Sequence, residues 1–75
     1  MPFIDIKVIE GVFTPEEKRE LVERVSEAVI AVEGEALRPV TTTTITETPS
    51  GEWAVGGRTY TADDVKAMRA SAVAV

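Results

Sequence analysis

The sequence predicts an α/β (α+β) fold in which a single β-α-β unit with parallel strands is followed by a short C-terminal hairpin. Three observations carry this prediction: an alternating apolar pattern over residues 2–9, a helical pattern that begins at residue 14, and a β-branched run over residues 40–48. A strand, a helix and a second strand joined by short links nearly always form a right-handed crossover, so the strands are expected to be parallel.

The first strand is predicted from the alternation in PFIDIKVI. Ile4, Ile6 and Val8 share one face, and Asp5 and Lys7 lie on the other. A repeat of two residues is typical of a strand with one buried face. One face of this strand is therefore expected to meet the helix that follows.

The start of the helix is the strongest local signal. Gly11 ends the strand, and in TPEE Thr14 takes the N-cap, Pro15 the first helical position and Glu17 the capping-box position. Gly34 is the expected stop. The predicted buried face consists of the apolar residues that recur at helical spacing, namely Leu21, Val22, Val25, Ala28, Val29 and Val32.

The second half of the chain is predicted as a linker over residues 35–39 and then a second strand over residues 40–48, VTTTTITET. A turn at PSG, a short WAV segment and Gly56-Gly57 indicate a hairpin, and a weak helix is expected around residues 62–71. The expected helix covers only one face of the sheet, and nothing else in the chain is predicted to cover the other.

Residues 1–75 are expected to form one domain, with 2–57 as its core and 58–75 as a partly helical tail. A chain of 75 residues buries only about 60% of the surface that it exposes when unfolded. Disulfides and zinc sites are excluded as supports, because the sequence has no Cys and no His. The sequence therefore predicts an oligomer, in which a neighbouring subunit covers the open face.

The same missing residues exclude thiol catalysis, imidazole acid–base catalysis and Ser-His-Asp chemistry, and no metal or cofactor is expected. The net charge is −5, and basic residues alternate with acidic ones, as in EEKRELVER, so nucleic acid is not an expected partner. The start of the chain does not resemble a signal peptide, and no apolar run approaches a membrane span. With no Cys, the expected location is cytoplasmic.

Four segments in order, MPFIDI, TPEEKRELVERVSEAV, TITE and EWAVGG, resemble the 4-oxalocrotonate tautomerase group of the tautomerase superfamily over nearly all of residues 2–57. The resemblance implies small subunits that assemble as hexamers, commonly trimers of dimers. It also implies that the initiator Met is removed and that the exposed Pro2 acts as base or acid in a pocket between subunits. The implied reaction is cofactor-independent keto–enol isomerisation of a small 2-oxo or 2-hydroxy-dienoate acid.

The chain departs from this pattern at the substrate-gripping arginines. Members of the group carry one Arg just after the Gly that ends the first strand, where Val12 or Phe13 stands here, and a second Arg where this chain has Thr42. Related dehalogenases and hydratases have a water-activating carboxylate at the position of Val55, so water addition is not expected.

Four residues are the candidate substrate contacts. Trp53 keeps the hairpin aromatic of the family and is expected to form an apolar wall that lowers the pKa of the Pro2 amine. Arg58 and Arg38 are candidates to contact the substrate anion, with Arg58 preferred because it follows the hairpin. Thr42 is a candidate only through its position in the family pattern.

Two alternatives to an enzyme that works alone remain open. In heterohexameric relatives such as trans-3-chloroacrylic acid dehalogenase, one subunit type carries the arginines. This chain is similar to the other type, which begins PFI and has an Arg shortly after the hairpin glycine, so it is a candidate arginine-lacking β-type subunit. A binding module that only reuses the fold is the third reading.

For Pro2, the simpler reading is a residue that starts an edge strand. If Met1 is retained, the Pro2 nitrogen is a tertiary amide with no basic lone pair. The C-terminal ASAVAV is expected either to pack on a neighbouring subunit or to be disordered.

Overall fold

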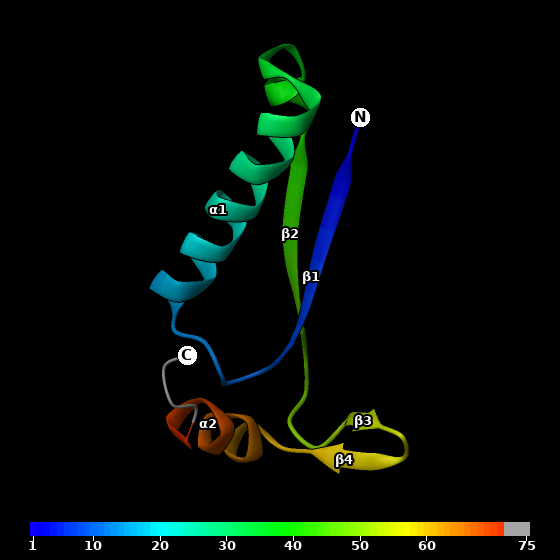
Figure 1. Cartoon of the computed structure of the whole chain (residues 1–75). Coiled ribbons are helices and arrows are strands. Elements are labelled where there is room, and N and C mark those ends of the chain that lie inside the picture. The colour runs from blue at the N-terminus through cyan, green and yellow to red at the C-terminus, as the bar shows by residue number, and fades with distance from the viewer. Residues whose placement is uncertain (72–75) are drawn as a thin grey trace.

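The computed structural model describes residues 1–71 of the chain (Figure 1). Residues 72–75, which belong to the C-terminal segment discussed above, lie outside the described part. The elements in order are β1 (Phe3–Ile9), α1 (Pro15–Glu33), the 3₁₀ helix η1 (Glu35–Val40), β2 (Thr42–Thr48), β3 (Trp53–Val55), β4 (Arg58–Tyr60) and α2 (Ala62–Ser71).

The predicted β-α-β unit is confirmed. Strands β1 and β2 pair in parallel with a register that runs from Phe3 opposite Thr42 to Ile9 opposite Thr48. Helix α1 crosses between them and covers one face of the two-stranded sheet (Figure 1). No helix within residues 1–71 is long and apolar enough to cross a membrane.

Both ends of α1 form as predicted. The Glu17 N–H donates to Thr14 Oγ1 at 3.1 Å, and the Thr14 N–H donates to Glu17 Oε1 at 3.0 Å, which completes the capping box. Pro15 takes the first helical position. At the other end, the Gly34 N–H donates to Ile30 O at 2.8 Å, and Gly34 has a φ of 108° that side-chain-bearing residues avoid.

The predicted buried face of α1 is wrong in part. Val32 is 90% exposed and Ala28 is also exposed, whereas Ile30, which was not predicted, is only 4% exposed. The contacts with β2 come from a neighbouring row on the helix: Lys18 Nζ donates to Glu47 Oε1 at 3.1 Å, and the Ser26 and Thr43 hydroxyls lie 2.6 Å apart. The helix is therefore turned relative to the predicted apolar stripe, so that Val32 faces outward.

The segment predicted as a linker over residues 35–39 is instead the short 3₁₀ helix η1, Glu35–Val40. Its conformation is held by local contacts, since the Leu37 N–H donates to Gly34 O at 3.2 Å and the Thr41 N–H donates to Arg38 O at 3.3 Å. Linker and 3₁₀ helix look alike in sequence because such helices are short and only weakly patterned.

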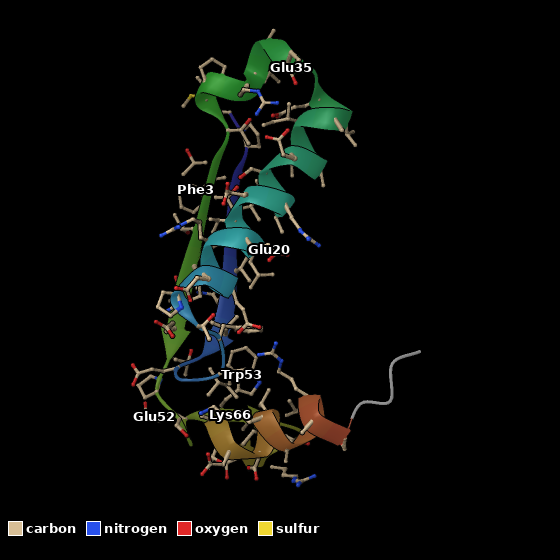
Figure 2. The ribbon with its side chains drawn as sticks, turned by 90° about the vertical axis from the view of Figure 1, so that its left-hand side faces the viewer. Phe3, Glu20, Glu35, Glu52, Trp53 and Lys66 are labelled. Carbon is tan, nitrogen blue, oxygen red and sulfur yellow. The ribbon has the colours of Figure 1, made fainter. Side chains whose placement is uncertain are left out.

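The face of the sheet away from α1 is open, and apart from Phe3 it is polar. The register places Phe3, Asp5 and Lys7 there beside alternate threonines of β2, and neither view shows a helix on this face (Figures 1 and 2). The Asp5 carboxylate accepts hydrogen bonds from Thr44 at 2.7 Å and from Thr46 at 2.8 Å, and these bonds lower its pKa.

The hairpin is built on a two-residue glycine turn. Strands β3 and β4 pair antiparallel, with Trp53 opposite Tyr60 and Val55 opposite Arg58. Gly56 and Gly57 have φ values of 59° and 84°. Positive φ at both central residues matches the twist of tight hairpins, and glycine adopts it without strain.

The predicted C-terminal helix is present as α2, and it is capped by Thr61. The Asp64 N–H donates to Thr61 Oγ1 at 3.1 Å, and the Thr61 N–H donates to Asp64 Oδ2 at 2.9 Å. This second capping box starts α2 directly after β4, so the hairpin and α2 form one unit.

Arg69 joins α2 to the start of α1. Its Nη2 donates to Glu17 Oε2 at 2.6 Å, its Nη1 donates to Val12 O at 3.2 Å, and its guanidinium lies 4.9 Å from the centroid of the Phe13 ring. The hydrogen bond from Arg69 is the main reason why the pKa of Glu17 falls to about 2, and the bond from the Thr14 N–H adds to it.

The buried core of a single chain is small. Among the described residues, the buried apolar side chains are Ile9, Val12 and Ile30. Large apolar side chains are exposed at several places, including Met1, Phe3, Val32, Val55 and Met68. So little burial is typical of a subunit whose remaining apolar surface meets other chains.

Candidate active site

Pro2 and Thr42 lie together at the amino end of the sheet. Pro2 directly precedes β1, and its carbonyl oxygen accepts a hydrogen bond of 3.1 Å from the Thr42 N–H. Thr42 stands opposite Phe3 in the register and is exposed, whereas Pro2 is half-buried. Two of the predicted site residues are therefore neighbours.

Thr42 differs from the threonines beside it. The hydroxyl of Thr41 donates to Glu33 and to Leu37 O, that of Thr43 lies against Ser26, and that of Thr44 donates to Asp5. The hydroxyl of Thr42 has no hydrogen-bond partner within residues 1–71. In this respect it differs from Thr41, Thr43 and Thr44.

Met1 still precedes Pro2 in this chain and is 92% exposed. While Met1 is attached, the Pro2 nitrogen is an amide and carries no basic lone pair. A free Pro2 amine requires cleavage of the bond between Met1 and Pro2. Cleavage of that bond would leave a secondary amine at the start of β1.

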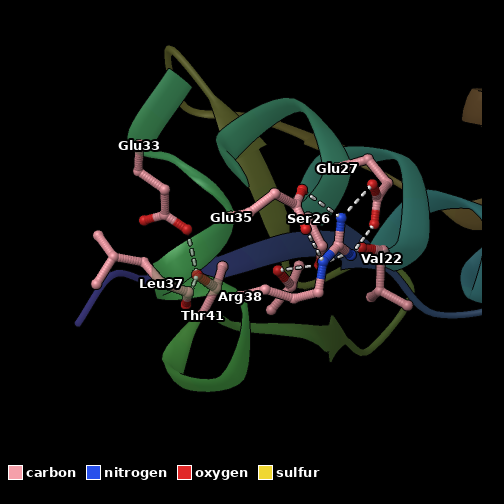
Figure 3. A network of polar contacts seen from close by, with 9 residues as sticks. Val22, Ser26, Glu27, Glu33, Glu35, Leu37, Arg38 and Thr41 are labelled. Atoms are coloured by element: carbon pink, nitrogen blue, oxygen red, sulfur yellow. Dashed lines mark hydrogen bonds and ion pairs between the residues drawn. The ribbon is translucent and has the colours of Figure 1, made fainter. Parts of the chain in front are cut away.

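Arg38 is held by two carboxylates, as Figure 3 shows. Its Nη1 and Nη2 donate to the two carboxylate oxygens of Glu27 at 2.6 and 3.0 Å, and its Nε and Nη2 donate to those of Glu35 at 3.0 and 2.9 Å. These bonds raise the pKa of Arg38 and lower the pKa values of Glu27 and Glu35. The guanidinium fastens η1 to α1, which leaves little donor capacity for a substrate.

Trp53 and Arg58 lie on the hairpin, where paired residues point to the same side. The Arg58 guanidinium carbon is 4.7 Å from the centroid of the Tyr60 ring, and Arg58 Nη1 donates to Tyr60 Oη at 3.4 Å. No carboxylate of residues 1–71 forms an ion pair with Arg58. In contrast to Arg38, it is a cation without a bound counter-ion.

The two groups of candidates lie at opposite ends of the molecule. Pro2, Thr42 and Arg38 are at the end where β1 begins, and Trp53 and Arg58 follow the end where β2 finishes (Figure 1). A seven-residue strand such as β1 spans about 23 Å. One chain therefore does not bring Pro2 and the hairpin residues into one pocket.

The family model described as "Tautomerase enzyme" matches residues 2–63. The chain belongs to the tautomerase family. The matched range begins at Pro2 and includes β1, α1, β2 and the hairpin. No curated protein sequence matches the chain significantly.

Solved structures of tautomerase-family proteins share this fold. YwhB, a homologue of 4-oxalocrotonate tautomerase, is 35% identical with a TM-score of 0.67, covering 84% of this chain and 97% of that chain. TomN, a homologue from the tomaymycin biosynthetic pathway, is 31% identical with a TM-score of 0.69, covering 93% and 97%. The structure described for the 4-oxalocrotonate tautomerase isozymes from Methylibium petroleiphilum is 31% identical with a TM-score of 0.69, covering 85% and 97%.

Sequence reasoning missed three contacts of these residues. The contact of Arg58 with Tyr60 could have been predicted, because residues two apart on a strand lie on the same face. The pairing of Arg38 with Glu35 could also have been predicted, because the two are three residues apart. The pairing of Arg38 with Glu27, eleven residues away, has no local signal and required the fold.

Proposed function

We propose that this member of the tautomerase family catalyses cofactor-independent keto–enol isomerisation of a small 2-oxo or 2-hydroxy-dienoate acid, with Pro2 as general base and acid. The observation that carries the proposal is the place of Pro2: the family match begins at this residue, and it directly precedes β1, where its carbonyl oxygen accepts a hydrogen bond from the Thr42 N–H. The proposal requires that Met1 be removed.

In this proposal one group, the Pro2 amine, both removes the proton and returns it. An α-amino group has a pKa of about 7.7–8.0, and apolar walls or a nearby cation lower it, so the free Pro2 amine is partly unprotonated near neutral pH. The amine accepts the proton of the enol hydroxyl while the C–O bond becomes a carbonyl and electron density moves to the conjugated carbon. The protonated amine then delivers the proton to that carbon, so Pro2 returns to its starting state.

The substrate contacts in this proposal come from more than one copy of the chain. Pro2 and Trp53 lie at opposite ends of a subunit, so a hairpin from another copy must approach Pro2 to complete the pocket. The small core and the open polar face of the sheet support such an assembly. A homohexamer, commonly a trimer of dimers in this family, is the proposed form.

Arg58 is the proposed anion contact in place of Arg38. Its guanidinium has no carboxylate partner in the described chain, whereas that of Arg38 already binds two. Trp53 is the proposed apolar wall, and the Thr42 hydroxyl is a proposed hydrogen-bond donor to the substrate. Arg38 keeps the structural role of holding η1.

The test combines intact mass with a pH–rate profile. We expect the purified protein to lack one methionine and to ketonise phenylenolpyruvate or 2-hydroxymuconate, with a rate that rises through one pKa at or below that of an ordinary amine. Pro2→Ala should reduce this activity by about 100-fold or more without changing the assembly. Full activity in a protein that retains Met1, or in the Pro2→Ala variant, would refute the mechanism.

A second candidate function is a structural, β-type subunit of a heterohexamer. It is favoured by the residues that replace the family arginines, since Val12 is buried and apolar and Thr42 is uncharged. Co-purification with a related chain that carries arginines at these positions would support this alternative. A homohexamer that is active by itself would exclude it.

A further inference from the structure

A groove of about 230 Å³ lies between the hairpin and α2. It is lined by Trp53, Val55, Tyr60, Val65 and Met68. Figure 2 shows Trp53 directly above α2, which forms the floor. The groove is separate from the start of β1 and belongs wholly to one chain.

The lining of the groove is apolar and open to the outside. Trp53 and Tyr60 are paired across the hairpin, and Val55 and Met68 are 62% and 59% exposed. Exposed apolar side chains gathered in a hollow indicate a binding surface. The volume exceeds the roughly 150 Å³ of an apolar cavity that binds benzene, so a phenyl-sized group fits.

A cation lies against one of the lining residues of this groove, Tyr60. Arg58 is on the same face of the hairpin as Trp53 and Tyr60, and its guanidinium lies over the Tyr60 ring. Asp64 is the acidic residue near it, but its carboxylate caps α2 by accepting from the Thr61 N–H, and it forms no ion pair with Arg58 within 4.0 Å. The groove therefore combines apolar walls with an available positive charge.

We propose that this groove is a substrate subsite for an aromatic or branched apolar tail of the 2-oxo or enol acid, whose carboxylate pairs with Arg58. The proposal rests on the proposed function and names the class of substrate. It commits to a small amphipathic carboxylate as the occupant, because an apolar lining beside a guanidinium that forms no ion pair in the described chain is complementary to a molecule with an apolar tail and one carboxylate. Tyr60 acts as a positioning residue that fixes the guanidinium over the groove.

Helix α2 adds lining residues to this subsite that lie outside the range matched by the family model. Val65 and Met68 lie beyond residue 63, where the family match ends. The helix is held against the start of α1 by Arg69 and Glu17. In this proposal, Val65 and Met68 are specificity-determining residues, and they select the tail of the substrate rather than its reacting carbons.

The binding test uses Trp53 as a reporter, because it is the single tryptophan of the chain. We expect phenylacetate to change Trp53 fluorescence saturably, and acetate to bind at least tenfold more weakly. Arg58→Gln and Met68→Glu should each weaken phenylacetate binding at least tenfold. Ala67→Glu is the matched control, since it adds the same charge at an exposed α2 position outside the groove, and it should change binding less than twofold.

A kinetic test separates this proposal from the proposed function. In Met68→Glu, the kcat/KM for phenylenolpyruvate should fall at least tenfold relative to that for 2-hydroxymuconate, with no such change in Ala67→Glu. Phenylacetate binding that is equal in the wild type and in Pro2→Ala, without any ketonisation, would keep the subsite and refute the enzyme.

Three results would overturn the subsite. The first is ketonisation by a protein whose Trp53 fluorescence does not respond to phenylacetate. The second is an equal loss of binding in Met68→Glu and Ala67→Glu. The third is Trp53 emission that changes on protein dilution but not with phenylacetate, because a second copy would then occupy the groove.

Discussion

The two ends of the molecule differ in the partners that bind their arginine side chains. At the end where β1 begins, Arg38 is bound by Glu27 and Glu35 through four hydrogen bonds. At the hairpin end, Arg58 lies over the ring of Tyr60 and has no carboxylate partner in the described chain. Arg38 therefore fastens η1 to α1, whereas Arg58 forms no ion pair in the described chain.

In our proposal, the partners that already bind an arginine decide its role more than its distance from the proposed base does. Arg38 shares an end of the molecule with Pro2, but its charge is already compensated. Arg58 is far from Pro2 in the same chain, and no carboxylate of the described residues forms an ion pair with it. A pocket that contains both a base and an anion contact must therefore combine different ends of neighbouring subunits.

The largest expected effect is the loss of the base. Pro2→Ala should reduce ketonisation by about 100- to 10,000-fold, the usual contribution of a general acid or base. Steady-state rates with phenylenolpyruvate would measure it, and size-exclusion chromatography would control for assembly. A reduction of less than tenfold in a correctly assembled protein would contradict the role of Pro2.

The next largest effect is the difference between substitutions of Arg58 and Arg38. Arg58→Gln should lower kcat/KM by about 10- to 100-fold, because the substrate carboxylate loses a charged hydrogen bond. Arg38→Gln should change kcat/KM less than threefold but lower the Tm, because Glu27 and Glu35 lose their shared partner. If Arg38→Gln instead lost activity at an unchanged Tm, Arg38 would be the anion contact and Arg58 the structural residue.

A smaller effect concerns the attachment of α2. Hydrogen bonding by Arg69 lowers the pKa of Glu17 from 4.5 to about 2, so the ionised form is favoured in the folded chain. The attachment should therefore be complete above about pH 4.5 and weaken as the pH falls toward 2. Trp53 emission should report the change, since Trp53 and α2 line one groove.

The control for this prediction is Arg24, a second arginine that pairs with a glutamate of α1 but does not belong to α2. Arg69→Gln should remove most of the acid-dependent change in Trp53 emission by loosening α2 already at pH 7. Arg24→Gln should behave as the wild type, because Arg24 pairs only with the exposed Glu20 within the described chain. Identical acid titrations of all three proteins would show that Arg69 does not hold α2.

The smallest effect is expected at Thr42. Thr42→Ala should lower kcat/KM about two- to tenfold, as for one neutral hydrogen bond to the substrate. Thr46→Ala is a suitable control, because Thr46 is also exposed on β2 but donates to Asp5. Equal losses in the two variants would point to the strand rather than to a substrate contact.

The features that the sequence predicted well are the local ones. The capping box of Thr14 and Glu17, the stop at Gly34 and the glycine turn of the hairpin each depend on residues within a few positions of one another. The parallel pairing of the strands also follows from a general rule for crossovers.

The features that it predicted poorly depend on packing. Val22 and Val29 fit both the predicted stripe and the observed face of α1, so periodicity alone does not fix the rotation of the helix. Contacts with β2, such as Ser26 with Thr43, decide it, and they bury Ile30 instead of Val32. In the same way, the resemblance named Pro2 and Trp53, but their separation in the chain became visible only in three dimensions.

The two-stranded sheet has a consequence for the behaviour of the protein in a cell. Each strand has one neighbour in the described chain, so each has a free edge. Residues 40–46, VTTTTIT, contain no charge, no Pro and no Gly, and are almost wholly β-branched. Segments of this kind stack readily into cross-β fibrils when an edge is left open. Subunit assembly that pairs or covers these edges would therefore also protect the chain from edge-to-edge aggregation.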